Sequence, residues 1–179
     1  ITASEYIQDP MLYNGYKFHL RLYVVVLVTP SYSKAWIKNT GVIVPAGEPF
    51  TNGDYDNAQI HDSHMSKNPQ LLGLYPRDLP TGNNYIAPIN DMLARALTVM
   101  LPLVSKYDES KNGYDLFGVD VMLTTAGVPL LLEFNRFPGF VTEPAYVNPQ
   151  FDTSMWKMEL FDTVILSVTA EIFGLGAVD

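Results

Sequence analysis

Residues 114–135, YDLFGVDVMLTTAGVPLLLEFN, contain two apolar runs joined by a short turn, and each run carries one acidic residue. Ala126-Gly127 is the best turn centre, because glycine accepts the positive φ that tight hairpins require. A two-residue loop at these positions puts Asp120 directly opposite Glu133 on the neighbouring strand. The stretch therefore predicts an antiparallel hairpin with two carboxylates side by side.

The two faces of this hairpin differ in character, because successive side chains of a strand point to opposite faces. The face predicted to join the core holds six apolar residues: Val119, Val121, Leu123, Leu130, Leu132 and Phe134. The other face holds two carboxylates and an amide beside two apolar residues: Asp120, Met122, Leu131, Glu133 and Asn135. This second face is the candidate site.

Like charges directly opposite each other destabilise a sheet, so the carboxylates need a neutralising partner. The sequence leaves three explanations open. The carboxylates could share a proton, as paired carboxyl groups do in acid chemistry. They could bind a cation, since two carboxylates and the amide oxygen of Asn135 form an oxygen-only set that suits Mg²⁺ or Mn²⁺, usually together with a phosphate. They could also lie on a solvated polar face beside a Lys or Arg.

The composition indicates a folded domain and argues against a nucleic-acid partner. The 179 residues are 47% hydrophobic and 17% charged, which is enough apolar material for one core. The 19 acidic residues outnumber the 11 basic ones, whereas a nucleic-acid surface needs a basic stripe. The longest apolar run, Leu22–Val28, is too short to span a membrane, and there is no cysteine. We therefore expect no membrane partner and a cytoplasmic location.

The remaining patterns predict an α+β domain, with a mostly antiparallel sheet and helices on one face. Residues 16–29 are β-branched and aromatic, and their VVVLV segment indicates a strand that is buried on both faces. Residues 35–45 are predicted to return as a second strand after a turn. Residues 45–89 are rich in Pro, Gly, Asn and Asp, which is typical of a long irregular segment.

Two helices are predicted in the second half of the chain. Asn90-Asp91 can cap a helix that continues to residue 107, with a kink at Pro102. Asp152-Thr153 can cap a last helix that ends at Gly174. This last helix carries an apolar stripe with a spacing of four residues, which is typical of core packing: Trp156, Leu160, Val164, Val168 and Ile172.

Basic side chains share one face of the strand predicted at residues 16–29, and they are Lys17, His19 and Arg21. Lysine acts as a point charge and arginine as a planar fork, so together they can meet a triphosphate. Alternatively, they are surface cations or partners of buried carboxylates. His61 and His64 lie in a stretch without helical pattern, and we interpret this pair as incidental. The sequence contains no nucleophile motif, P-loop or dinucleotide-binding glycine motif.

Four segments of the chain follow one another in a familiar order: YIQDPMLYNGYKFHLRLYVVV, GVIVPAGEPF, HDSHMSK and LFGVDVMLTTAGVPLLLEFNRFP. In these segments the chain resembles the tubulin tyrosine ligase-like family, which belongs to the ATP-grasp superfamily. The resemblance runs from about residue 4 to residue 138, and the DV…LLEFN block is its most specific part. It implies that residues 1–179 form a single C-terminal ATP-grasp domain. Family members have an N-terminal part of the ATP-grasp fold that this sequence lacks, so the resemblance implies a fragment, a missing half on a separate chain, or a vestigial site.

The resemblance further implies roles for single residues. Asp120, Glu133 and Asn135 match the family residues that hold Mg²⁺ and ATP. Lys17 matches a lysine that contacts ATP phosphate, and Arg21 matches an arginine near the transferred phosphoryl group. Tyr6 and Ile7 match the family residues whose backbone contacts the adenine of ATP. Leu132 matches an apolar residue that lies beneath the adenine.

The implied reaction is the ATP-dependent ligation of a carboxylate to an amine through an acyl phosphate. The substrates would be a carboxylate-bearing protein, peptide or small molecule and an amino acid. Three positions depart from the family pattern: His19, Val44 and Asp62-Ser63. Two alternatives stay open, a non-catalytic binding module with the same fold and an ATP-grasp ligase that acts on a peptide or small molecule.

Overall fold

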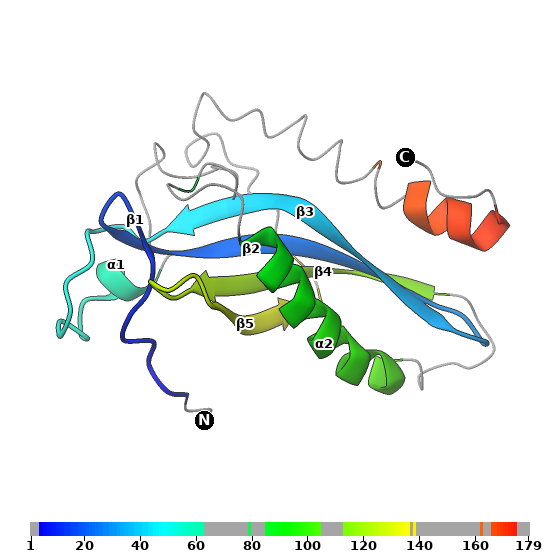
Figure 1. Ribbon diagram of the computed structural model, residues 1–179, viewed down its shortest axis with the longest axis horizontal. Coiled ribbons are helices and arrows are strands. Elements are labelled where there is room, and N and C mark those ends of the chain that lie inside the picture. The colour runs from blue at the N-terminus through cyan, green and yellow to red at the C-terminus, as the bar shows by residue number, and fades with distance from the viewer. Residues whose placement is uncertain are drawn as a thin grey trace.

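The computed structural model describes residues 4–62, 79, 85–104, 113–136, 138, 162 and 166–174 (Figure 1). Within these residues the elements follow the order β1 (Leu12–Tyr13), β2 (Tyr16–Val28), β3 (Ser33–Pro45), α1 (Ala58–His61), α2 (Ile86–Val104), β4 (Gly113–Leu123) and β5 (Pro129–Asn135). A further helical segment at residues 166–173 lies near the C-terminus. The sheet is antiparallel throughout, so the predicted α+β class is confirmed.

β2 is the central strand of the sheet. It pairs with β3 along one edge and with β4 along the other, and its first residues pair with β1. β5 then pairs with the outer edge of β4. Both predicted strands of the first half are confirmed, since β2 covers residues 16–28 and β3 covers residues 33–45. Any side chain on β2 is therefore fixed by neighbours on both sides.

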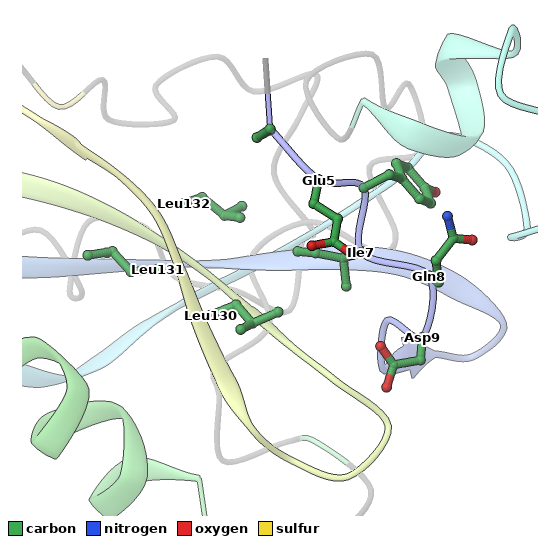
Figure 2. A pocket seen from close by; sticks show the side chains of 9 residues that line it. Glu5, Ile7, Gln8, Asp9, Leu130, Leu131 and Leu132 are labelled. Carbon is green, nitrogen blue, oxygen red and sulfur yellow. The ribbon is translucent and has the colours of Figure 1, made fainter. Parts of the chain in front are cut away.

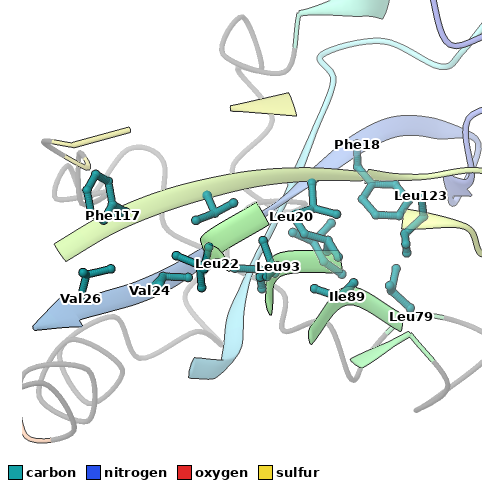
Figure 3. Close-up of a cluster of buried hydrophobic side chains, with 14 residues drawn as sticks. Phe18, Leu20, Leu22, Val24, Val26, Leu79, Ile89, Leu93, Phe117 and Leu123 are labelled. Carbon is teal, nitrogen blue, oxygen red and sulfur yellow. The ribbon is translucent and has the colours of Figure 1, made fainter. Parts of the chain in front are cut away.

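One face of the sheet packs against α2 and forms the larger apolar core (Figure 3). α2 contributes Ile89, Leu93 and Leu97, which are at most 3% exposed and recur every four residues, so they form one stripe. The sheet contributes a layer of alternate residues from β2 and β4: Phe18, Leu20, Leu22, Val24, Val26, Phe117, Val119, Val121 and Leu123. This period of two is the alternation expected of strands.

The opposite face of β2 is also buried, and along its second half the buried residues are apolar. Tyr23, Val25 and Leu27 form a smaller apolar cluster with Val42 of β3 and Val168 of the C-terminal helical segment. The prediction that VVVLV is buried on both faces is confirmed. The prediction that helices lie on one face is wrong, because Val168 packs against the face opposite α2. The apolar stripe alone could not specify which face it would cover.

The β4–β5 hairpin has the predicted pairing at the candidate site but a different turn. Asp120 pairs with Glu133 as predicted. The loop has three residues rather than two, because the amide of Thr124 donates to the carbonyl of Val128 while the amide of Val128 donates to Oγ1 of Thr124. Gly127 adopts a φ of 77° in this loop, and its amide donates to the carbonyl of Thr124. The resulting shift of one residue is cancelled by a β-bulge in β5.

The bulge changes which leucines face the core. Leu132 is the extra residue between the two registers, and it is 45% exposed. Leu131 pairs with Val121 and packs against the larger core, whereas Leu130 pairs with Met122. The predicted core positions of Leu130 and Leu132 are therefore wrong, because strict alternation fails where a strand gains a residue.

α2 begins four residues before the predicted cap. Its first residue is Ile86, and Asn90 and Asp91 lie inside the helix. Pro88 is tolerated there because the first turn needs no backbone donor. Pro102 also lies inside the helix, as predicted. The predicted end at residue 107 lies outside the described residues.

By length and composition alone, Ile86–Leu103 could cross a membrane. Here the helix covers the core with one stripe, and an ion pair between Asp91 and Arg95 lies on its exposed side with a distance of 3.1 Å. The absence of a membrane partner stays a prediction.

The last predicted helix is described only in part. Its proposed cap and three residues of its stripe lie outside the described residues. Val168 is buried, whereas Ile172 is 43% exposed, and Gly174 ends the segment with a φ of 63°. Positive φ favours glycine, which explains why the helix stops there. In the segment predicted to be irregular, residues 45–89, the described residues include the short helix α1 and the first turn of α2.

A glycine at the β2–β3 bulge generates a stability prediction. A Cβ on Gly41 would overlap the backbone carbonyl of Arg21 and come within 2.7 Å of Leu22 Cδ2. Gly41→Ala should therefore lower the free energy of unfolding by about 1–3 kcal/mol in urea titrations. Gly113→Ala is the matched control, since nothing lies within 4 Å of its Cβ, and it should change the value by less than about 0.5 kcal/mol. Equal effects of both substitutions would contradict this explanation.

Candidate functional site

The charged half of β2 precedes its apolar half on the same face. Lys17 and His19 are buried and Arg21 is partly buried, while Tyr23 begins the smaller apolar cluster. Burial raises the pKa of Tyr23 to about 12. The prediction that the three basic residues share one face is consistent with this alternation. The face thus changes from charged to apolar within one strand.

Arg21 forms a two-pronged ion pair with Asp120 across β2 and β4. Its Nε donates to Oδ1 at 2.5 Å, and its Nη2 donates to Oδ2 at 3.0 Å. Asp120 is 3% exposed, so its charge needs this partner. Burial alone would lower the pKa of Arg21, but the hydrogen bonds and charge of Asp120 outweigh burial and raise it. The sequence left three explanations open for how the paired carboxylates are neutralised. For Asp120 the structure shows one of them, a neighbouring arginine.

The three predicted metal ligands lie together. The side-chain nitrogen of Asn135 donates to Asp120 Oδ2 at 3.2 Å and to Glu133 Oε1 at 2.9 Å. The amide therefore links the buried carboxylate to the exposed one. A half-turn of this amide would present its oxygen instead, since the two ends of an Asn side chain have nearly the same shape.

This donor set fits a hard divalent cation. It offers two carboxylates and one amide oxygen from adjacent strands, as Mg²⁺ and Mn²⁺ prefer. Within the described part of the chain, no three His, Cys, Asp or Glu side chains gather closely enough to hold a metal ion. As far as the described residues go, the remaining coordination positions are open to water or a bound phosphate. His19 also approaches this group, with its Nε2 3.6 Å from Asp120 Oδ1.

Gly118 makes room for the ion pair. A Cβ at this position would lie 2.7 Å from Pro138 Cβ and 3.3 Å from Cδ and Nη1 of Arg21. The guanidinium can therefore lie across β4 only because residue 118 has no side chain. Sequence reasoning did not identify Gly118, because its contacts come from distant segments.

A cavity of about 600 Å³ lies beside β5 (Figure 2). One wall is the extended segment Ser4–Asp9, and the other is Leu130–Leu132 of β5. The carbonyl of Asp9 accepts a hydrogen bond from the amide of Thr125, which ties the first wall to the hairpin loop. The bulge residue Leu132 thus turns toward this cavity rather than the core. The predicted adenine contacts Tyr6, Ile7 and Leu132 all line it.

Lys17 connects this cavity to the charged face. Its Nζ lies 3.4 Å from the hydroxyl oxygen of Tyr6 and 4.5 Å from the centroid of the Tyr6 ring. Burial lowers the pKa of Lys17. His61, which the sequence suggested was incidental, forms a hydrogen bond with the same Tyr6 hydroxyl at 2.8 Å. His64, its predicted companion, lies outside the described residues.

Comparison with known proteins identifies the class of protein that carries this sheet and site. The model of the tubulin-tyrosine ligase family matches residues 1–72 and 77–171. The chain therefore belongs to the tubulin-tyrosine ligase family, as the resemblance predicted.

Individual relatives are distant in sequence. The chain is 24% identical to the probable tubulin polyglutamylase TTLL9 of Bos taurus, over 97% of this chain and 40% of that protein. It is 23% identical to the tubulin polyglutamylase TTLL6 of Mus musculus, over 90% of this chain and 22% of that protein. It is 24% identical to the tubulin glycylase 3B of Drosophila melanogaster, over 76% of this chain and 21% of that protein. The chain thus spans less than half the length of these relatives.

The contrast between the two carboxylates predicts different effects on stability. Asp120→Asn leaves Arg21 partly buried without its counter-charge, so it should lower the free energy of unfolding by about 3–5 kcal/mol. Glu133→Gln changes an exposed side chain and should alter it by less than about 0.5 kcal/mol. Urea unfolding followed by circular dichroism measures both values. A neutral effect of Asp120→Asn would mean that the Arg21 ion pair does not stabilise the sheet.

Proposed function

We propose that this chain is the C-terminal part of an ATP-grasp catalytic domain and that it serves ATP-dependent ligation of a carboxylate to an amine. The observation that carries the proposal is the adjacency of Asp120, Glu133 and Asn135, with Glu133 directly following the cavity residue Leu132 in β5. Membership of the tubulin-tyrosine ligase family supports the same class of reaction. Residues 1–179 would act as one domain.

The cavity beside β5 would take the adenine of ATP. Ile7 and Leu132 offer apolar contact from its two sides, and the extended backbone around Tyr6 offers hydrogen-bonding groups. Lys17 and Arg21 would then meet the phosphates. These residues are four apart on an extended strand, a separation of about 13 Å along the strand. The two cations would neutralise the charge of the transferring phosphoryl group.

Mg²⁺, or Mn²⁺ in its place, would be held by Asp120, Glu133 and Asn135. When bound, such an ion neutralises phosphate charge and orients the phosphates. Asp120 would then be shared between the ion and Arg21. The side-chain amide of Asn135 would rotate by a half-turn, so that its oxygen rather than its nitrogen faces the ion. His19, close to Asp120, would limit the space on the β2 side.

The proposed reaction has two parts. The substrate carboxylate attacks the γ-phosphorus of ATP, which forms an acyl phosphate and releases ADP. The amine nitrogen then attacks the acyl carbon, which forms an amide and releases phosphate and a proton. The contribution of this chain is to position the phosphates with Lys17 and Arg21 and to stabilise negative charge.

The names of the relatives suggest a protein substrate. They are described as tubulin polyglutamylases and a tubulin glycylase, so we propose an amino acid as the amine and a carboxylate of a tubulin-like protein as the acceptor. The net charge of −8 favours a second candidate, because it would repel a strongly acidic acceptor. That candidate is an ATP-grasp ligase that acts on a peptide or small molecule. A cytoplasmic location remains part of the proposal.

Glu133→Gln is the sharpest test, because it removes one proposed metal ligand from an exposed position. In the complete protein, we expect the wild type to release ADP and phosphate from ATP when a suitable acceptor and amino acid are supplied with Mg²⁺. Glu133→Gln should reduce this turnover at least about 100-fold while the unfolding curve stays unchanged. Screens with tubulin and with free peptides would separate the two candidate substrates.

Two controls make the test specific. Arg95→Gln changes an exposed charge on α2, far in sequence from the site, and should leave turnover unchanged. Removal of Mg²⁺ with a chelator should abolish turnover. Wild-type rates in the Glu133→Gln protein would rule out the metal role, and complete inactivity of the wild type would favour a non-catalytic binding module.

A further inference from the structure

A directed chain of hydrogen bonds runs from a backbone carbonyl to the ammonium group of Lys17. His61 Nε2 lies 2.7 Å from the carbonyl oxygen of Asp54, and a carbonyl can only accept, so Nε2 carries the proton. In the neutral ring Nδ1 is then an acceptor, and it lies 2.8 Å from the hydroxyl of Tyr6. Tyr6 therefore donates to His61.

The direction of this bond decides what Tyr6 offers to Lys17. A phenol has one O–H proton, and the bond to His61 uses it. The oxygen of Tyr6 can then only accept, and Lys17 Nζ lies 3.4 Å away. The ammonium also lies 4.5 Å from the centroid of the Tyr6 ring, within the range of a cation–π contact. Both contacts favour the charged form of Lys17.

Aromatic packing holds the middle of this chain in place. The Tyr6 ring meets Tyr55 edge to face at 5.2 Å and His61 edge to face at 5.5 Å. Phe50 also packs edge-on against His61, at 6.2 Å. Tyr6 comes from the N-terminal segment and the other three rings come from residues 50–61, so this packing joins two segments that are far apart in sequence. The contacts of the ring and the hydrogen bond to His61 together place the tyrosine hydroxyl beside Lys17.

Lys17 needs such support for two reasons. Its long side chain loses about 2 kcal/mol of rotamer entropy when it is ordered. It is also buried, and burial favours the neutral amine over the ammonium ion. An ammonium ion that meets phosphate has to stay charged and correctly placed. The chain that ends at Asp54 counters both effects.

We propose that His61 and Tyr6 are positioning residues that hold the side chain of Lys17, as a cation in one rotamer, beside the cavity that Tyr6 lines. The placement of Lys17 does not depend on ATP, whereas its use against phosphate rests on the proposed function. Tyr6 thus acts through its side chain, in addition to the backbone role that the family resemblance implies.

Tyr6→Phe tests the placement directly, since it removes only the hydroxyl oxygen and keeps the ring. NMR of protein labelled at the lysine ε-carbon would follow the titration of Lys17, assigned with Lys17→Arg. We expect the pKa of Lys17 to fall below that of the wild type, because one acceptor for the ammonium is lost. Affinity for ATP, measured by calorimetry, should fall about tenfold, as expected for one hydrogen bond to a charged group.

Three further variants separate the proposed chain of hydrogen bonds from a general loss of structure. Tyr55→Phe removes a hydroxyl from the same aromatic cluster, one that donates to Gln8 at 3.2 Å, and it should leave the Lys17 titration unchanged. His61→Asn keeps an acceptor near the position of Nδ1 and should behave like the wild type. His61→Leu removes that acceptor and leaves the Tyr6 hydroxyl without a fixed orientation, so it should shift the Lys17 titration in the same direction as Tyr6→Phe but by less. Equal behaviour of His61→Asn and His61→Leu would contradict the chain of donors.

The two readouts separate this inference from the proposed function. If Tyr6→Phe shifts the Lys17 titration but the wild type binds no ATP, the positioning is supported and the nucleotide role fails. If the wild type binds ATP but Tyr6→Phe and Tyr55→Phe both titrate and bind like the wild type, the positioning is overturned. Circular dichroism of each variant confirms that the fold is retained.

Discussion

The Arg21–Asp120 ion pair is the interaction on which the site depends. A carboxylate that is 3% exposed would not be stable in the middle of a sheet without a counter-charge, and Arg21 supplies two hydrogen bonds to it. The pair joins β2 to β4 at directly opposite positions. It also anchors the amide of Asn135, which in turn reaches Glu133. The ion pair and the amide of Asn135 together connect the polar groups of three neighbouring strands, β2, β4 and β5.

The parts of the fold that the sequence predicted are those that depend on local pattern. The apolar run of β2 has a period and a length that specify a strand buried on both faces, and this was confirmed. The opposition of Asp120 and Glu133 was also predicted correctly, although the turn was not. A loop one residue longer than expected and a bulge one residue long cancel each other before the site is reached.

The remaining features depend on contacts between distant segments. Gly118 shows its importance only when Arg21 and Pro138 are seen beside it. His61 is separated from Tyr6 by 55 residues, so no local pattern could reveal their hydrogen bond. The start of α2 was missed because Asn90 and Asp91 are good caps in isolation, while packing of Ile89 against the sheet extends the helix backwards.

The bulge at Leu132 has a consequence for how this domain can diverge. Residues that obey the alternation of a strand are constrained by the core on one side or by their cross-strand partners on the other. Leu132 escapes both constraints, because it is the one residue of β5 between the two registers and points toward the cavity. Its size can therefore change without a compensating change in the interior. Substitution at this single position would reshape the wall of the cavity while the scaffold stays intact.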